Sequence, residues 1–324
     1  MDQLLNYIAS LPGAVAQGLI WGIMAIGVYI TYKVLDIADL TVDGSICTGA
    51  AVCAAMMTMG YSLPVSILCA FLAGALAGLL TGIFHTFMGI PAILSGILTQ
   101  LILWSVNLKI MGMAIAKSSA SNLPLSARNF STLVSMLDMH RSLIVLEVIC
   151  IVVIGVLYWF FGTEYGCSLR ATGANPNMSR AQGINVNGSK IFGLVLSNAI
   201  VAFAGALLAQ YQGNADINMG KGAIVIGLAA VIIGEALFGW LSRNNFALKL
   251  ITVVLGGIVY FLVYSTVIYL GLDSNYLKML SAIVVAIFLA VPHWKTKYFS
   301  GPHIKGHRSQ KPRNLSVQTE RKAN

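Results

Sequence analysis

Long apolar runs, separated by short polar segments, make up most of this chain. A helix of about 20 apolar residues is long enough to cross the hydrocarbon core of a bilayer. The pattern therefore predicts an all-α, polytopic membrane protein with about nine transmembrane helices, within a range of eight to ten. The second run is short, so its helix is expected to be broken or re-entrant. The predicted spans cover residues 14–35, 41–59, 64–84, 89–109, 142–162, 190–211, 222–242, 247–270 and 275–292.

A polar segment, residues 163–190, separates the fifth and sixth runs. Asn175 is a good N-cap, Pro176 suits the first helical position, and Gly183 is a natural helix stop. The predicted helix between them has about two turns, far too short to cross a bilayer. A short capped helix between two spans indicates a coupling element that presses against a partner outside the membrane.

Composition and charge agree with the membrane class. Hydrophobic residues make up 57% of the chain and charged residues 10%, with a mean hydropathy of +0.81. A soluble domain carries roughly 25% charged residues. The chain is expected to divide into a transmembrane domain, residues 1–292, and a basic tail, residues 293–324.

The tail contains eight Lys or Arg residues against one acid, Glu320, and this excess predicts a cytoplasmic C-terminus. The same orientation places residues 163–190 in the cytoplasm. Nine spans put the N-terminus outside, whereas a tenth would reverse it. The tail is interpreted as an orientation anchor at the membrane lipid. Nucleic-acid binding is not expected, because no folded basic domain accompanies the tail.

Two short segments of the chain are similar to each other. Residues 38–42 read Ala-Asp-Leu-Thr-Val, and residues 215–219 read Ala-Asp-Ile-Asn-Met, and each precedes a small-residue stretch. Five predicted spans separate them, so they would enter the membrane from opposite faces. An inverted repeat of this kind is typical of transporters. Chance similarity in a biased composition is the alternative.

Small residues also recur at a helical spacing of four in the third run, at Ala70, Gly74, Gly78 and Gly82. This spacing places them on one helix face, where another helix backbone can approach closely. We therefore expect tight helix packing along that face.

No enzymatic or metal-binding motif is found. The chain lacks the Gly-x-x-x-x-Gly-Lys-Ser/Thr phosphate loop, so it is not expected to hydrolyse ATP by itself. The metalloprotease His-Glu-x-x-His and the hydrolase Gly-x-Ser-x-Gly motifs are also absent. Five cysteines include no Cys-x-x-Cys pair, so neither a metal site nor a disulfide framework is expected.

Five polar residues in or beside the spans are candidates for a substrate path. Asp39 and Asp43 are expected at a span junction, where they either cap a helix or line a vestibule. Gln100 and Asn198 are expected to point inward, as interhelical hydrogen bonds or as solute contacts. Glu235 lies deeper, and it either faces a water-filled path or sits near the cytoplasmic end.

The polar segment also carries a family resemblance. It is similar to the cytoplasmic loop of the bacterial branched-chain amino acid/ribose/nucleoside class of ABC importer permeases, and the small-residue stretch Ala204–Ala209 continues the match. Residues 38–45 resemble the Asp-Leu-Ser-Val-Gly-type segment of sugar permeases in that class. The resemblance covers residues 15–292, and the order and spacing look closest to a Gram-positive subgroup associated with aromatic amino-acid uptake (tryptophan/tyrosine-type). The motifs that carry it are Glu164-Tyr165-Gly166, Leu169-Arg170-Ala171-Thr172-Gly173, Asn175-Pro176 and Ala181-x-Gly183-Ile184-Asn185.

The resemblance implies a type II-like importer permease in the bacterial plasma membrane. Two permease copies, with a homodimer favoured, would assemble with a pair of ATP-binding subunits, and these would hold the ATP and magnesium. An extracytoplasmic solute-binding protein or lipoprotein would deliver an amino acid, with a sugar or nucleoside as the alternative solute. Glu235 and the basic tail are departures from the sugar permeases, so they argue against a sugar without excluding it. The residues implied in ATPase coupling are Glu164, Gly166, Arg170, Gly173, Asn175, Pro176, Ser179, Arg180 and Gly183.

Two other classes of function fit the sequence less well. An ion-coupled secondary transporter or channel would need no ATPase, but the sparse intramembrane carboxylates argue against it. An assembly or scaffold protein without transport would leave the similar segments and the capped cytoplasmic helix unexplained.

Overall fold

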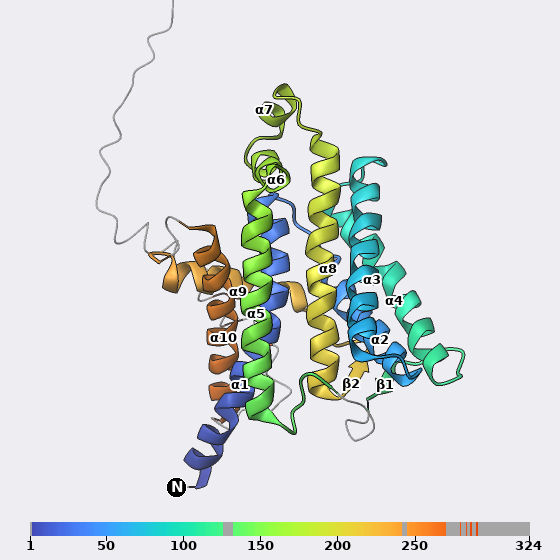
Figure 1. Cartoon of the computed structure of the whole chain (residues 1–324), viewed down its shortest axis with the longest axis vertical. Coiled ribbons are helices and arrows are strands. Elements are labelled where there is room, and N and C mark those ends of the chain that lie inside the picture. The colour runs from blue at the N-terminus through green and yellow to red at the C-terminus, as the bar shows by residue number, and fades with distance from the viewer. Residues whose placement is uncertain are drawn as a thin grey trace, which may run out of the picture.

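The computed structural model describes residues 2–125, 132–241 and 245–269, together with Met279, Ile283, Ala286 and Ala290. This part of the chain is almost entirely helical (Figure 1). Its elements are α1 (Asp2–Tyr29), the π-helical turn η1 (Ile30–Val34), α2 (Val42–Thr58), α3 (Leu63–Thr86), α4 (Ala92–Ala114), β1 (Asn122–Pro124), α5 (Met139–Gly162), α6 (Glu164–Ala174), α7 (Pro176–Ala181), α8 (Val186–Gln212), β2 (Asn214–Asp216), α9 (Ala223–Phe238) and α10 (Phe246–Tyr269).

The described residues contain six helices that are long and apolar enough to cross a membrane, rather than nine. They are α1 continued by η1, α3, α4, α5, α8 and α10. The runs 41–59 and 222–242 form α2 and α9, which have only 17 and 16 residues. The run 275–292 lies outside the described residues, apart from four isolated helical positions.

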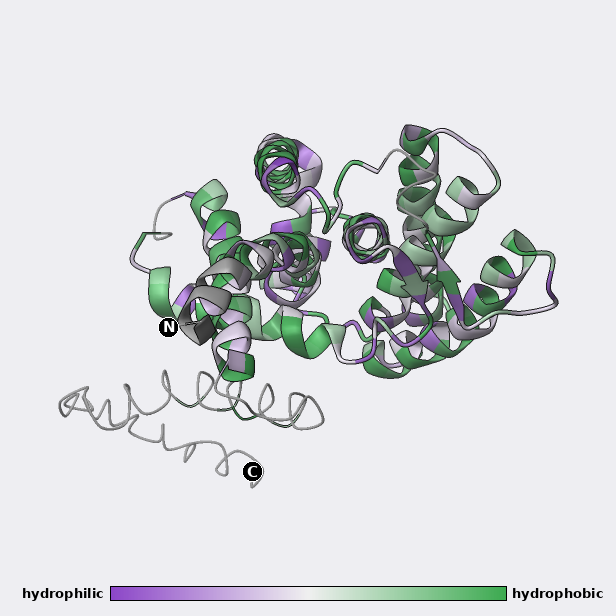
Figure 2. Ribbon diagram, turned by 90° about the horizontal axis from the view of Figure 1, so that it is seen from below, coloured by the Kyte–Doolittle hydropathy of each residue, from purple (hydrophilic) through white to green (hydrophobic). Residues whose placement is uncertain are grey.

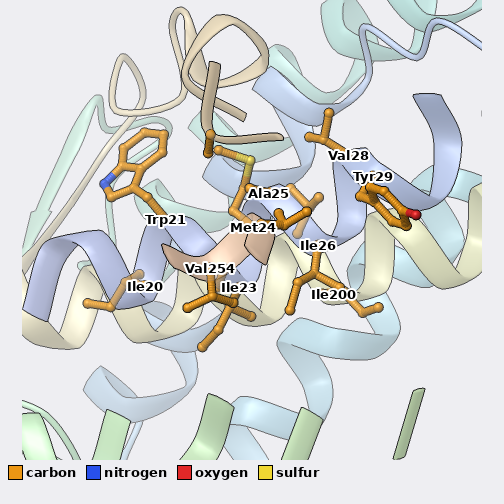
Figure 3. Close-up of a cluster of buried hydrophobic side chains, with 14 of the residues drawn as sticks. Ile20, Trp21, Ile23, Met24, Ala25, Ile26, Val28, Tyr29, Ile200 and Val254 are labelled. Carbon is orange, nitrogen blue, oxygen red and sulfur yellow. The ribbon is translucent and has the colours of Figure 1, made fainter. Parts of the chain in front are cut away.

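Two helices form the centre of the bundle. In the span windows of α1 and α8, 83% and 72% of residues are buried, against 17% for α5 at the periphery. Ile20, Ile23 and Met24 of α1 pack with Ile200 of α8 and Val254 of α10 (Figure 3). The peripheral helices keep their apolar side chains outward, as lipid contact requires, and Figure 2 shows apolar residues over the outer helices.

Small residues allow the central helices to approach closely, as expected for the third run. A Cβ on Gly78 of α3 would collide with the backbone of Leu194 of α8, and one on Gly74 would collide with the backbone of Asn198. Gly49 of α2 meets Ala202 of α8 in the same way. Close backbone approach between α2, α3 and α8 therefore depends on glycine at these positions.

The short helices α2 and α9 begin beside each other inside the bundle and run toward opposite ends. Asp43, in the first turn of α2, accepts hydrogen bonds from the N–H groups of Gly222 (3.1 Å) and Ile224 (2.9 Å) at the start of α9. From there α2 continues to the end of the molecule where β1 and β2 pair, whereas α9 reaches η1 at the end nearest α6. Each helix is short because it starts partway through the bundle.

The two similar segments of the sequence lead into these two helices. In the first, the Asp39 Oδ1 accepts a hydrogen bond from the N–H of Thr41 (2.9 Å). In the second, the Asp216 Oδ1 accepts one from the N–H of Asn218 (2.6 Å). Each aspartate thus closes the same kind of turn two residues ahead, and each turn precedes a short apolar helix.

The segment α6–α7 extends past the spans at one end of the molecule, while α1 begins at the other end (Figure 1). The strands β1 and β2 pair antiparallel at the end where α1 begins, with Leu123 opposite Ala215. The two ends of the bundle are therefore different in character. One carries the polar helical segment, and the other carries a small two-stranded sheet.

Candidate functional site

Three side-chain caps define the segment between α5 and α8. The Thr163 hydroxyl accepts from the Gly166 N–H (3.4 Å), Asn175 Oδ1 accepts from the Met178 N–H (3.0 Å), and Asn185 Oδ1 accepts from the Gly188 N–H (3.0 Å). Each satisfies a backbone donor that the first turn of a helix leaves unpaired. The predicted Asn175 N-cap and the position of Pro176 in the first turn of α7 are both confirmed.

The end of α7 also follows the sequence expectation. Helix α7 ends at Ala181, and Gly183 adopts a left-handed backbone conformation with φ of +81°. The N–H of Ile184 then bonds the Ser179 carbonyl (3.0 Å), which closes the helix end. Ser179 is buried, and its hydroxyl donates to the Asn175 carbonyl (3.0 Å), so it stabilises the turn from within.

Five of the candidate coupling residues differ in whether they face the bundle or the surface. Gly166 and Gly173 face the bundle, since a Cβ at either would collide with the backbone of Phe161 or Val34. Arg170 donates from Nη2 to the Phe161 carbonyl (2.9 Å), and its guanidinium lies 5.8 Å from the ring centroid of Phe246. Arg170 therefore fixes α6 against α5 and α10. Glu164 and Arg180 are exposed.

The exposed tip of this segment includes two large apolar side chains that were not among the candidates. Tyr165 is 79% exposed and Met178 is 62% exposed. Both lie beyond the long spans, next to charged residues, where lipid contact does not explain them. Their exposure at a capped helix is the structural signal that the sequence pattern alone did not single out.

Asp39 and Asn198 form the centre of a buried polar network. The Asn198 Nδ2 donates to Asp39 Oδ2 (2.7 Å), and the Ser45 hydroxyl donates to Asn198 Oδ1 (2.6 Å). Both residues are buried, and for Asn198 the structure displays interhelical hydrogen bonding, one of the two roles expected for it. Hydroxyl–hydroxyl hydrogen bonds extend the network from Thr41, just before α2, to α3 and α4. They join Thr41 to Thr81 (2.7 Å) and Thr81 to Thr99 (2.9 Å).

Asp43 and Gln100 lie next to this network, at the start of α2. Asp43 caps α9, as described above, which is one of the two roles expected for it. Gln100 lies on α4 directly against Gly44, since a Cβ on Gly44 would be 3.3 Å from the Gln100 Cα. The fold thus gathers four of the five candidate path residues around the first turns of α2.

Glu235 lies apart from the other four. Its Oε2 is 2.8 Å from the Nζ of Lys33, and both side chains are about 40% exposed. The pair is at the end of α9 nearest α6, so Glu235 lies near one end of the bundle. Lys33 also lines a cavity of about 600 Å³ together with Asp36, Arg170 and Lys249.

Lys221 is not among the candidate residues from the sequence. It is exposed in the turn before α9, and its Nζ lies 5.0 Å from the ring centroid of Trp104 on α4. The sequence signal that could have identified Lys221 is a lysine between two glycines, immediately ahead of an apolar run.

Among the described residues, no group of three His, Cys, Asp or Glu side chains could hold a metal ion.

Comparison with known proteins gives consistent matches. The family described as "Branched-chain amino acid transport system / permease component" matches residues 11–292. The tyrosine transport system permease protein of Clostridioides difficile is 39% identical over 275 residues, covering 85% of this chain and 88% of the relative.

Two more distant relatives transport other solutes according to their names. The galactose/methyl galactoside import permease of Escherichia coli is 24% identical over 243 residues (74% of this chain, 69% of the relative). The autoinducer 2 import system permease of Yersinia pseudotuberculosis is 28% identical over 214 residues (65% of this chain, 58% of the relative). No solved structure gives a significant match.

Proposed function

Because the chain belongs to the family of branched-chain amino acid transport permeases, we propose that it is the membrane-spanning subunit of an ATP-driven importer of an amino acid. The substrate class rests on the tyrosine permease, which is the relative of high identity and nearly full coverage reported above. The galactose permease, at lower identity, supports a sugar as the second candidate. An aromatic or branched-chain amino acid is the favoured solute.

The observation that carries the proposal is the capped, exposed helix α7 beyond one end of the spans (Figure 1). In this proposal α7 is the coupling helix, and it docks on an ATP-binding subunit that holds the ATP and magnesium. Tyr165, Met178 and Arg180 form its contact surface, because they are exposed there. Gly166, Arg170 and Gly173 transmit its movement, because they hold α6 against the bundle.

The proposed transport cycle is alternating access around α2 and α9. These helices start together and run apart, which supports the proposed inverted repeat in which each half contributes one broken helix. Movement of α7 would reach α9 through α6, η1 and the Lys33–Glu235 ion pair. The end that carries β1 and β2 would receive the solute from an extracytoplasmic binding protein or lipoprotein.

The assembly is proposed to contain two permease copies, as a homodimer, and two ATP-binding subunits in the plasma membrane. The basic tail would lie in the cytoplasm on the same side as α7. Residues 1–292 would form the transmembrane domain, in contact with membrane lipid.

The test is reconstitution of the purified permease, its ATP-binding subunit and its binding protein in proteoliposomes. We expect uptake of radiolabelled tyrosine that requires ATP and persists without an ion gradient. Uptake that proceeds without the ATP-binding subunit, or that follows a sodium or proton gradient, would overturn the proposal and favour a secondary transporter.

A further inference from the structure

A lysine lies at mid-depth in the bundle, on an exposed surface, without an acidic partner among the described residues. Lys221 belongs to the turn between β2 and α9, and its Nζ is over the ring of Trp104 at 5.0 Å. Trp104 is near the middle of α4, a helix of 23 residues that is long enough to span the membrane. The ion pair that the described residues do form joins Lys33 to Glu235 at the end of the bundle.

The backbone around Lys221 is held firmly in place. The Lys221 N–H donates to the Asn218 carbonyl (3.1 Å), and the next N–H, of Gly222, donates to Asp43 (3.1 Å). A Cβ on Gly220 would collide with the Asp43 carbonyl. The Asp43 carboxylate accepts the two N–H groups at the start of α9 and is not within ion-pair distance of Lys221. The ammonium group is thus positioned but unmatched.

A charged side chain at this depth cannot face lipid without a large penalty. It must therefore face water, a solute or another protein surface. The exposed surface around it is made of Lys221 and Asn218 from the turn and Trp104 from α4, with Gln100 one helical turn before the tryptophan. It combines one cation, one aromatic face and neutral hydrogen-bonding groups.

We propose that this surface is the solute site of the permease, and that Lys221 binds the carboxylate of an amino acid while Trp104 contacts its apolar or aromatic side chain. The inference rests on the proposed function and narrows its substrate class. A carboxylate is the natural partner of an ammonium group that has no ion pair of its own. An indole ring offers a large flat surface to an apolar or aromatic group. A neutral sugar would use the ring but would leave the cation unmatched.

The test uses the complete transporter with Asn218→Cys, in a background where Cys69 and Cys167, the cysteines that are not buried, are replaced by alanine and serine. A cationic, membrane-impermeant thiosulfonate is expected to modify the new thiol. Tyrosine at roughly ten times its dissociation constant should slow the modification by about tenfold, whereas tyramine, which lacks the carboxylate, should not. Lys221→Met should abolish the protection, and Lys221→Arg should retain it.

Lys109→Met is the matched control, because Lys109 is an exposed lysine on α4 nearer the sheet end, and protection should persist in that variant. The inference is overturned if the thiol is inaccessible, if tyramine protects as well as tyrosine, or if protection survives Lys221→Met. Protection by galactose that does not need Lys221 would also overturn it. ATP-driven uptake by the unmodified transporter tests the proposed function separately. Uptake without Lys221-dependent protection would refute this site but not the proposed function. Lys221-dependent protection without ATP-driven uptake would refute the import mechanism but not this site.

Discussion

At the scale of single residues, two glycines with the same backbone strain differ only in where they lie. Gly183 follows α7 with φ of +81°, and Gly60 follows α2 with φ of +89°; a Cβ on either meets no atom within 4 Å. A leucine at either position costs ~1–2 kcal/mol of left-handed strain. In the proteoliposome uptake assay, Gly183→Leu should lower transport by about tenfold, because strain of that size can unwind the end of a two-turn helix. Gly60→Leu should transport normally, and equal losses in both variants would remove the coupling role from α7.

The Asp39 network gives a second residue-scale prediction. Both Asp39 oxygens accept N–H groups, one from Asn198 and one from Thr41, in a buried position. In Asp39→Asn, the new amide N–H₂ must point toward one of these two donors. We therefore expect the free energy of unfolding to fall by ~1–3 kcal/mol and the melting temperature to fall by several degrees. Asp36→Asn is the control, because Asp36 is exposed and its φ of 56° suits asparagine. Thermal unfolding in detergent measures both, and matching melting temperatures would show that the network does not stabilise the fold.

At the scale of elements, the Lys33–Glu235 pair joins the end of η1 to the end of α9. Its side chains are partly exposed, so it contributes less than about 1 kcal/mol to stability. Its effect should therefore be on transport, through the position of α9. Lys33→Glu and Glu235→Lys should each reduce ATP-driven uptake, because each places like charges side by side, and the double exchange should restore most of it. A double variant no better than the single ones would mean that the pair does not link the two helices during transport.

The helices also show where the sequence is informative about this fold. Local chemistry predicted α7 well, because Asn175, Pro176 and Gly183 act within one short segment. The apolar runs at 41–59 and 222–242 were located correctly but interpreted as spans. Hydropathy records that a run is apolar, but not where in the bundle its helix begins. That starting point depends on Asp43 capping α9 from far away in the sequence, and no local pattern carries this contact.

At the scale of the whole molecule, the candidate site is a product of long-range packing. Asp39, Asp43 and Asn198 were chosen from the sequence as isolated polar residues, and the fold brings them together through backbone contacts between α2, α3 and α8. Lys221 and Trp104 become neighbours because the turn before α9 lies beside α4. The residue types could be identified from the sequence, whereas their grouping depends on the glycines that let these helices touch.

The same packing determines which parts of the chain share one end of the bundle. Arg180 on α7 and Ser62 before α3 lie at opposite ends of the bundle and are both exposed (Figure 1). In the proposed orientation, which follows the positive-inside rule, α7 would lie in the cytoplasm with the basic tail. The loop at 110–141 would then lie outside, although it also carries basic residues. With Cys69 and Cys167 replaced, Ser62→Cys should react with an impermeant maleimide on intact spheroplasts, because it faces outward. Arg180→Cys should react only after permeabilisation. The reverse pattern would place α7 outside the cell, where it could not meet an ATP-binding subunit, so the coupling proposal would fail together with the orientation.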